Sequence, residues 1–196
     1  MYARMMAVSR RVERLAATAD LPDPAAVTEA TQALYRGQCN CAYWHGAFGG
    51  IYLPHLRNAV YRELIAADVA ADRAEGRSTP WVEGTTGDFD FDGRTEIRLA
   101  GDGLEAWFAP ARGGMVYELD LRDQRHNLLA TLDRRPEAYH AQVLAGPGNA
   151  RSVVDASQVA KFKQEGLEQL VRYDATRRKS LVDHFWDCDV SADAIV

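Results

Sequence analysis

Residues 88–121 read DFDFDGRTEIRLAGDGLEAWFAPARGGMVYELDL, with apolar and polar residues in alternation. This period of two is typical of strands that bury one face. Three dipeptides that favour tight turns between antiparallel strands interrupt the alternation, at Asp92-Gly93, Asp102-Gly103 and Gly113-Gly114. The stretch therefore predicts a β-meander.

The chain before Trp81 has a helical period instead. Five apolar residues at its start recur at alternating steps of four and three, which places them on one face of a helix: Met1, Met5, Val8, Val12 and Leu15. They predict a first helix over residues 1–15.

Two further helices are predicted from their end signals. Asp23 is an N-cap candidate, Pro24 suits the first helical position, and Gly37 fits a left-handed C-cap. Pro54 opens a third helix with an apolar stripe. Three helices with short connections predict a small bundle.

These patterns predict an α+β protein that changes character near residue 80. A helical bundle domain is expected over residues 1–80, and a β-rich domain over residues 81–196. Within the second domain we expect one short helix in residues 155–174 and one more strand in residues 177–186.

Composition narrows the class of function. The 23 Lys and Arg residues are outnumbered by 28 Asp and Glu residues, and no basic stripe interleaved with aromatic residues occurs, which disfavours nucleic acid as a partner. No apolar run approaches the length of a membrane span. Three cysteines, at positions 39, 41 and 188, do not make a disulfide framework. We therefore expect a cytoplasmic protein without a membrane partner.

Two motifs contain residue types that bind metals, but we interpret neither as a metal site. Asp88, Asp90, Asp92 and Gly93 match the first half of a calcium loop, but its twelfth position holds Leu99 where a bidentate Glu is needed. We therefore predict a half-buried strand there.

Cys39, Cys41 and His45 are zinc-ligand types, but structural zinc sites usually combine a Cys-x-x-Cys pair with a second pair of ligands. Only one Cys-x-Cys occurs here. The sequence therefore predicts no metal site and no cofactor.

Tyr43, Trp44 and His45 form an aromatic cluster between the second and third helices. One interpretation makes Trp44 a core plug at a helix junction, with His45 as its hydrogen-bonded neighbour. The other makes the indole a flat apolar surface for a sugar ring, with nearby polar groups bonding the sugar hydroxyls. Spacing alone leaves both open.

A family resemblance favours the second interpretation. Residues 38–68, QCNCAYWHGAFGGIYLPHLRNAVYRELIAAD, resemble the last conserved region of glycoside hydrolase family 57, in its 4-α-glucanotransferase and α-amylase branch. Residues 159–186, VAKFKQEGLEQLVRYDATRRKSLVDHFW, are similar to the segment that leads these enzymes into their C-terminal β-sandwich. The resemblance covers nearly the whole chain in the family's order.

The resemblance implies a three-part parent enzyme: a β/α barrel, a central helical bundle of the family 57/38 type, and a galactose-mutarotase-like β-sandwich. This chain would hold the bundle and the start of the sandwich. Family members are retaining enzymes whose two catalytic carboxyl groups come from the barrel. No Asp or Glu here matches those positions, so no catalytic residue is predicted.

Carried over by position, the resemblance implies that Trp44 stacks on a glucose unit with Tyr43, His45 and Asn40 near it. The family generally has Asp where this sequence has Cys41. A thiol is a weaker hydrogen-bonding group than a carboxylate, so Cys41 should weaken sugar binding.

We therefore expect the non-barrel portion of an α-glucan-acting enzyme that binds glucan and supports the barrel. Its partners would be an α-1,4-glucan or maltooligosaccharide and a separate barrel polypeptide. The alternative is a stand-alone module that binds carbohydrate or a partner without catalysis. A sandwich cut after Trp186 should leave apolar surface and strand edges uncovered, so self-association is also expected.

Overall fold

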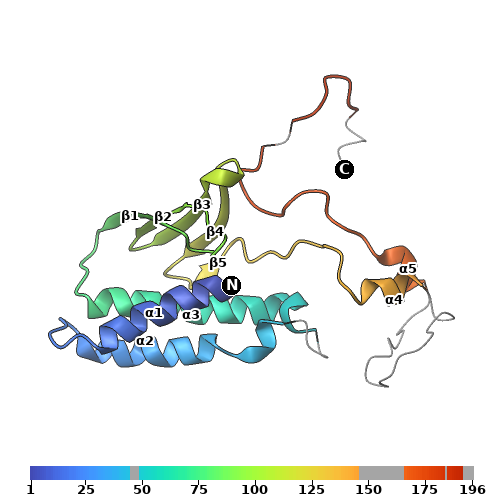
Figure 1. The fold of residues 1–196 in the computed structure, drawn as a ribbon. Coiled ribbons are helices and arrows are strands. Elements are labelled where there is room, and N and C mark those ends of the chain that lie inside the picture. Colours follow the sequence, from blue (N-terminus) through green and yellow to red (C-terminus); the bar gives the residue numbers. More distant parts are fainter. Residues whose placement is uncertain (45–48, 146–165, 184, 192–196) are drawn as a thin grey trace, which may run out of the picture. The chain divides into compact units, whose positions relative to one another are not determined.

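The computed structural model describes residues 1–44, 49–145, 166–183 and 185–191. The chain divides into two compact units. The first comprises Met1–Thr131 with Lys179–Val196, and the second comprises Leu132–Arg178. The first unit contains the three long helices and the sheet (Figure 1).

The three predicted helices are present as α1 (Tyr2–Ala16), α2 (Pro24–Gly37) and α3 (Pro54–Ala74). The Asp23 carboxylate caps α2 by accepting a hydrogen bond from the Ala26 N–H at 3.2 Å. Among the described helices, none combines the length and the apolarity that a bilayer span requires.

Gly37 does not form the left-handed cap that its position suggests. It is the buried last residue of α2 and is absent from the glycines with positive φ. A Cβ on Gly37 would lie 2.9 Å from Leu64 Cδ2, so glycine is needed here because α2 and α3 approach closely. Small residues fill the rest of this contact, and the helical core contains Val8, Val12, Ala30, Ala33, Leu34, Val60, Leu64, Ala67 and Ala70.

The predicted meander is a five-stranded antiparallel sheet in the order β1-β2-β3-β4-β5. Asp102 and Gly103 form the two-residue connection between β2 and β3, as predicted. A short 3-10 turn, η3 (Pro110–Arg112), precedes β4. The strand bounds are β1 Val82–Gly87, β2 Glu96–Gly101, β3 Leu104–Ala109, β4 Met115–Leu121 and β5 His126–Asn127.

The α+β fold class is confirmed. In the first unit the sheet lies over α1 and α3, and α2 lies on the far side of these helices (Figure 1). A single open sheet follows the helices, which is consistent with part of a β-sandwich.

The strand predicted at Asp88–Asp92 is wrong, because these residues form a loop between β1 and β2. The Asp88 carboxylate accepts hydrogen bonds at 3.1 Å from the N–H groups of Asp92 and Gly93, which bends the chain back on itself. Phe91 has a positive φ of 63°, which no strand residue adopts. Local side-chain bonding therefore overrides the alternation.

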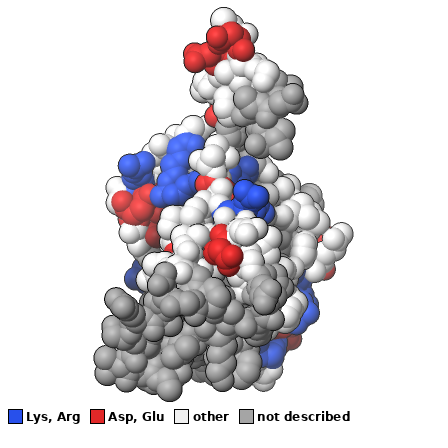
Figure 2. All heavy atoms as spheres, turned by 90° about the vertical axis from the view of Figure 1, so that its right-hand side faces the viewer, with Lys and Arg blue, Asp and Glu red and all other residues white. Residues whose placement is uncertain are grey.

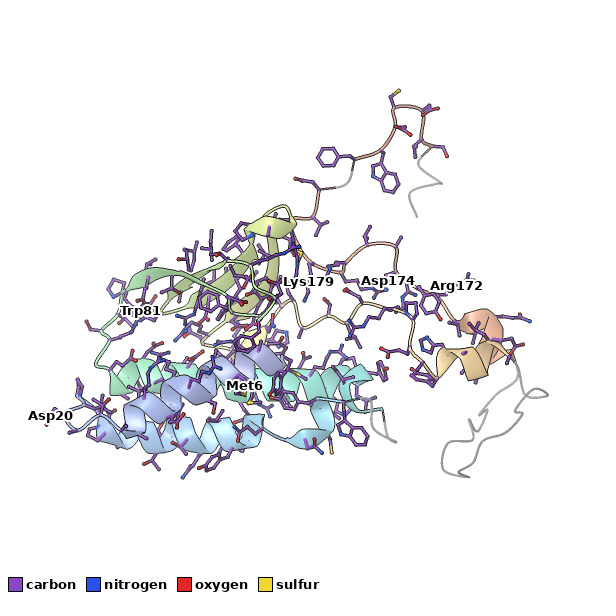
Figure 3. All side chains as sticks on the ribbon, in the orientation of Figure 1. Met6, Asp20, Trp81, Arg172, Asp174 and Lys179 are labelled. Atoms are coloured by element: carbon purple, nitrogen blue, oxygen red, sulfur yellow. The ribbon has the colours of Figure 1, made fainter. Side chains whose placement is uncertain are left out.

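The described residues of the strand predicted over residues 177–186 form one bridge, between Ser180 and Val116, and His184 lies outside the described residues. Leu181 has a positive φ of 56°, which ends the extended path. Lys179 holds this segment on the sheet (Figure 3), since its Nζ donates to the carbonyls of Tyr117 and Leu129 at 3.1 Å each.

The second unit contains two short helices, α4 (His140–Leu144) and α5 (Leu167–Leu170). α5 lies inside the range predicted for one short helix, and residues 155–165 of that range lie outside the described residues. Asp174 receives hydrogen bonds from the N–H and side chain of Arg134, and Arg178 pairs with the same carboxylate. These bonds hold the pKa of Asp174 below its usual value.

The two faces of the sheet have an unexpected chemistry. Register pairs place one set of side chains toward the helices, and these are largely polar: Arg98, Glu105, Trp107, Glu118 and Asp120. The opposite face, called the outer face below, consists of Ile97, Leu99, Leu104, Ala106, Phe108, Leu119 and Leu121. Leu99 and Leu104 remain 45% and 48% exposed.

A buried layer of charges joins the helices to the sheet, with Arg4 of α1 at its centre. Arg4 pairs with Asp68 of α3, with Glu118 at 2.8 Å, and with Glu105 and Asp120 at 3.3 and 3.5 Å. All five side chains are at most 6% exposed. The guanidinium also lies over the Trp107 ring, 5.0 Å from its centroid.

Two more arginines extend this layer. Arg122 pairs with Asp72 of α3 and, at 2.7 Å, with Glu105. Arg11 pairs with Asp68 at 3.0 Å and with Asp72. Trp81, between the helices and the sheet in Figure 3, lies under the guanidinium of Arg122 at 5.4 Å. Ion pairs and stacked guanidinium groups therefore replace much of the apolar contact expected between a helix layer and a sheet.

The layer shifts the pKa values of its carboxyl groups in opposite directions. Burial alone would raise the pKa of Asp68 and Glu105, but the neighbouring arginines outweigh burial and hold both below their usual values. Burial and the nearby Glu118 carboxylate raise the pKa of Asp120 to about 9. Asp120 is therefore a neutral acid at pH 7.

Candidate functional site

The predicted sugar-binding residues lie between α2 and α3, in residues 38–53, called the junction segment below. It contains two 3-10 turns, η1 (Asn40–Ala42) and η2 (Gly50–Tyr52), and ends at Pro54. Asn40 and Cys41 are exposed on η1. His45 lies outside the described residues.

Trp44 and Tyr43 are neighbours in sequence but have different surroundings. Trp44 is 49% exposed, so it is not a core plug. Tyr43 packs against the helical core, and its hydroxyl donates to the Gly37 carbonyl at 2.5 Å. Burial raises the pKa of the Tyr43 hydroxyl above its usual value. Tyr43 therefore anchors the segment, while Trp44 presents indole surface to solvent.

Arg57 supports the junction segment and was not predicted to have a role. Its side chain is buried on α3 and donates to the Ile51 carbonyl at 2.5 Å and to the Ala130 carbonyl at 3.2 Å. The Ile51 N–H in turn donates to the Trp44 carbonyl at 2.8 Å. Arg57 thus connects the backbone that carries Trp44 to the end of the sheet. An arginine on the inward side of a predicted helix was the available signal.

The cysteines do not assemble a metal centre with other described residues. Cys39 and Cys41 are exposed and outside any disulfide. Within the described part of the chain, one group of three carboxylates approaches within 4.8 Å, at Asp88, Asp90 and Glu96.

This carboxylate group already has donors. Arg112 contacts Asp90 at 3.3 Å, and backbone N–H groups bond to Asp88 and Glu96. Several of the oxygens that a cation would use are therefore already hydrogen-bonded to the protein.

Glu118 and Asp120 invite comparison with a glycosidase pair, because they are neighbouring carboxyl groups and the pKa of Asp120 is raised. Both are at most 3% exposed and lie beneath α1 in contact with Arg4. A glycosidic oxygen cannot reach them, so they belong to the support of the fold.

The charges on the surface shown in Figure 2 do not indicate a binding site for a polyanion. Figure 2 shows Lys and Arg in small groups beside Asp and Glu on the described surface of this face. Such mixed groups do not make the broad positive field that a polyanion would need. The half-exposed indole of Trp44, with its fixed backbone, is therefore the feature of the junction segment best suited to a neutral ligand.

Two family models match this chain in order. Residues 1–71 match the alpha-amylase/4-alpha-glucanotransferase middle domain, and residues 88–196 match the alpha-amylase/4-alpha-glucanotransferase C-terminal domain. The chain belongs to the alpha-amylase/4-alpha-glucanotransferase family. The predicted resemblance to the 4-α-glucanotransferase and α-amylase branch of glycoside hydrolase family 57 is thereby confirmed.

Individual members of the alpha-amylase/4-alpha-glucanotransferase family align with nearly the whole chain. Alpha-amylase 1 of Dictyoglomus thermophilum is 34% identical over 96% of this chain and 26% of its own length. The 4-alpha-glucanotransferase of Thermococcus litoralis is 36% identical over 94% of this chain and 25% of its own length. The chain therefore spans about a quarter of these relatives.

The fold agrees with a solved member of the family. The crystal structure of the Thermococcus litoralis 4-alpha-glucanotransferase superposes with a TM-score of 0.56 and 39% sequence identity. The superposition covers 71% of this chain and 19% of that one. The chain thus corresponds to a non-barrel, C-terminal portion of these enzymes, as predicted.

Proposed function

We propose that this chain is part of an enzyme that transfers or hydrolyses α-1,4-glucan segments. Its own contribution is to bind the glucan, or a maltooligosaccharide, at the junction segment. It also supports a catalytic barrel, which belongs either to another polypeptide or to a longer form of the same protein. The names of its relatives, 4-alpha-glucanotransferase and alpha-amylase, support this substrate class.

The half-exposed Trp44 carries the proposal. An indole face covers the apolar face of a glucose ring, and the Arg57–Ile51 contacts hold its backbone in place before ligand arrives. Asn40, on the adjoining turn, offers an exposed amide to a sugar hydroxyl. His45 remains part of the proposed site.

Calorimetric titration with maltoheptaose tests the site. We expect Trp44→Ala to weaken binding at least about tenfold, which is about 1.4 kcal/mol. Trp186→Ala is a matched control, because Trp186 is a similarly exposed indole at 51%. Equal affinities of wild type and Trp44→Ala would overturn the proposed site.

Cys41 allows a gain-of-function test. Cys41→Asp introduces the carboxylate acceptor that the family generally has, so it should tighten maltoheptaose binding. Cys41→Ser, which adds a neutral hydroxyl, should have a smaller effect. A weaker Cys41→Asp would count against a sugar hydroxyl at this position.

Chromatography of the same mixtures tests catalysis. We expect no new glucans from the isolated chain, because its described carboxylate pairs are buried or already bonded. Longer and shorter glucans appearing together would refute the non-catalytic assignment. Activity that returns only when a family barrel polypeptide is added would favour an enzyme portion over a stand-alone module.

We also propose that the outer face receives the rest of the β-domain, and that it drives self-association of the isolated chain. Leu99 and Leu104 give it exposed apolar area. Light scattering should show dimers or larger species for wild type and a smaller species for Leu99→Lys combined with Leu104→Lys. A monomeric wild type would contradict this.

Two organisational predictions stay proposals. We propose a domain boundary near residue 80, supported by the family models, which end at residue 71 and resume at residue 88. We propose a cytoplasmic location, supported by the exposed thiols of Cys39, Cys41 and Cys188. Maleimide labelling that requires cell lysis would support the location, and labelling of intact cells would contradict it.

A further inference from the structure

A cleft of about 320 Å³ opens between α1, the β1–β2 loop and the inner side of the sheet. Five arginine side chains line it, against two carboxylates, Asp68 and Asp88. Its volume is that of a small-molecule pocket and exceeds what a bare anion fills. The excess of guanidinium groups indicates a ligand with negative charge.

Three of these arginines, Arg4, Arg11 and Arg98, are already paired with buried carboxylates. The other two, Arg10 and Arg14, are exposed at the mouth and form no ion pair with any carboxylate in the described ranges. Asp88 forms no ion pair with either of them, and its oxygens accept the N–H groups of its own loop. The mouth therefore has two guanidinium groups available to a ligand.

Arg10 is already oriented. Its guanidinium lies over the Phe91 ring, 5.2 Å from the centroid. Stacking uses the face of the guanidinium and leaves the N–H donors in its plane free for an oxyanion. Arg14 follows Arg10 by one helical turn on α1, so the two side chains can approach one anion together.

The aromatic side chain at the edge of the cleft indicates that the ligand has an apolar part in addition to its anionic group. Phe91 is 46% exposed and held at φ 63°, a costly conformation for a bulky residue. Thr85, whose register partner is the inward-facing Arg98, adds a hydroxyl group to the lining. The indole N–H of Trp107, another lining residue, is buried and has no acceptor among the described residues. A ring-bearing ligand with hydroxyl groups matches this set of walls.

We propose that the cleft binds a phosphate monoester of a sugar. Arg10 and Arg14 hold the phosphate oxygens by charge-assisted hydrogen bonds, while Phe91 and the Thr85 hydroxyl contact the sugar. This site is separate from the junction segment and does not depend on Trp44.

Calorimetry at low ionic strength tests the proposal with glucose 1-phosphate, inorganic phosphate and glucose as probes. We expect wild type to bind glucose 1-phosphate more tightly than phosphate and to bind glucose weakest. Arg10→Gln combined with Arg14→Gln should weaken glucose 1-phosphate binding at least about tenfold. Trp44→Ala should leave it within about twofold, which separates this site from the proposed glucan site.

A matched control removes two other exposed helix arginines, by Arg36→Gln combined with Arg62→Gln. These side chains are 59% and 60% exposed and contact Glu63. An equal loss of affinity in this control would mean nonspecific attraction and would overturn the proposal. The proposal would also be overturned if folded wild type did not bind glucose 1-phosphate at millimolar concentration. Equal affinities for glucose 1-phosphate and inorganic phosphate would overturn it too, because the sugar would then contribute nothing to binding.

Discussion

Replacing Arg4 by methionine keeps an unbranched side chain, although a shorter one, and removes the charge at the centre of the buried layer. Asp68 would keep Arg11, and Glu105 would keep Arg98 and Arg122. Glu118 has no other cation within ion-pair distance among the described residues. The variant therefore buries one carboxylate without a cationic partner.

Breaking a buried ion pair from one side costs about 3–5 kcal/mol. We expect a loss near the lower end of this range, because the raised pKa of Asp120 keeps that neighbouring carboxyl group protonated. Urea unfolding followed by circular dichroism at pH 7 measures it. Arg36→Met is the control, since it breaks an exposed pair with Glu63 and should cost about 0–1 kcal/mol.

The pH dependence gives an independent check. Without Arg4, the folded-state pKa of the nearby carboxyl groups rises, so the folded variant binds more protons than the folded wild type. Lower pH then favours the folded variant, and its deficit should shrink from pH 8 to pH 5. A loss no larger than that of Arg36→Met, or a deficit that grows toward pH 5, would refute the role given to Arg4.

Three other changes have defined outcomes. The folded-state pKa of Asp120 is about 9, so the stability that the protonated group contributes is full below about pH 4 and is lost as the pH rises through 9. Asp120→Asn should therefore reduce the change in the free energy of unfolding between pH 5 and 9, measured by urea titration. Gly37→Ala should lower the free energy of unfolding by about 1–3 kcal/mol, because its Cβ would lie 2.9 Å from Leu64 Cδ2, and an unchanged midpoint would contradict the close approach. Arg57→Met should weaken maltoheptaose binding, because it removes the hydrogen bond to the Ile51 carbonyl that positions the junction segment. Arg57→Lys keeps a donor and should restore part of the affinity. An equal loss of affinity in both variants would mean that Arg57 acts through packing alone.

The helices and the meander could be predicted because their signals are local. Asp23 and Pro24 start α2 as expected, and the two-residue turn at Asp102-Gly103 joins two strands as expected. The same alternation failed at Phe91, where Asp88 captures backbone N–H groups and bends the chain. A side chain that bonds the backbone a few residues away can outweigh a periodic pattern.

The buried face of the sheet could not be predicted from its strands. Alternation in β3 fits two orientations, with Leu104 and Phe108 inward or with Glu105 and Trp107 inward. The structure has the second, because Arg4, more than a hundred residues earlier in the chain, supplies the charge that Glu105 needs. Ion pairs between distant segments leave no periodic trace in either segment.

The candidate site was predicted in part. Trp44 is exposed, which the sugar-binding interpretation needs and the core-plug interpretation does not fit. The orientation of Tyr43 toward the core depends on the Gly37 carbonyl, which sequence spacing does not specify. Arg57 acts through two carbonyl oxygens, and carbonyl groups are the same at every position, so no pattern of residue types reveals its role.

The charge layer has a consequence for engineering chimeras within this family. Layers with apolar contacts can be exchanged between relatives, since one aliphatic surface packs tolerably on another. A contact made of ion pairs requires each charged side chain to meet one of opposite charge. Grafting this sheet onto another member's helices would succeed when Arg4, Asp68 and Asp72 travel with Glu105 and Arg122, and fail when the graft divides them. The two layers should therefore be exchanged as one piece in a chimera, whatever boundary the residue numbering suggests.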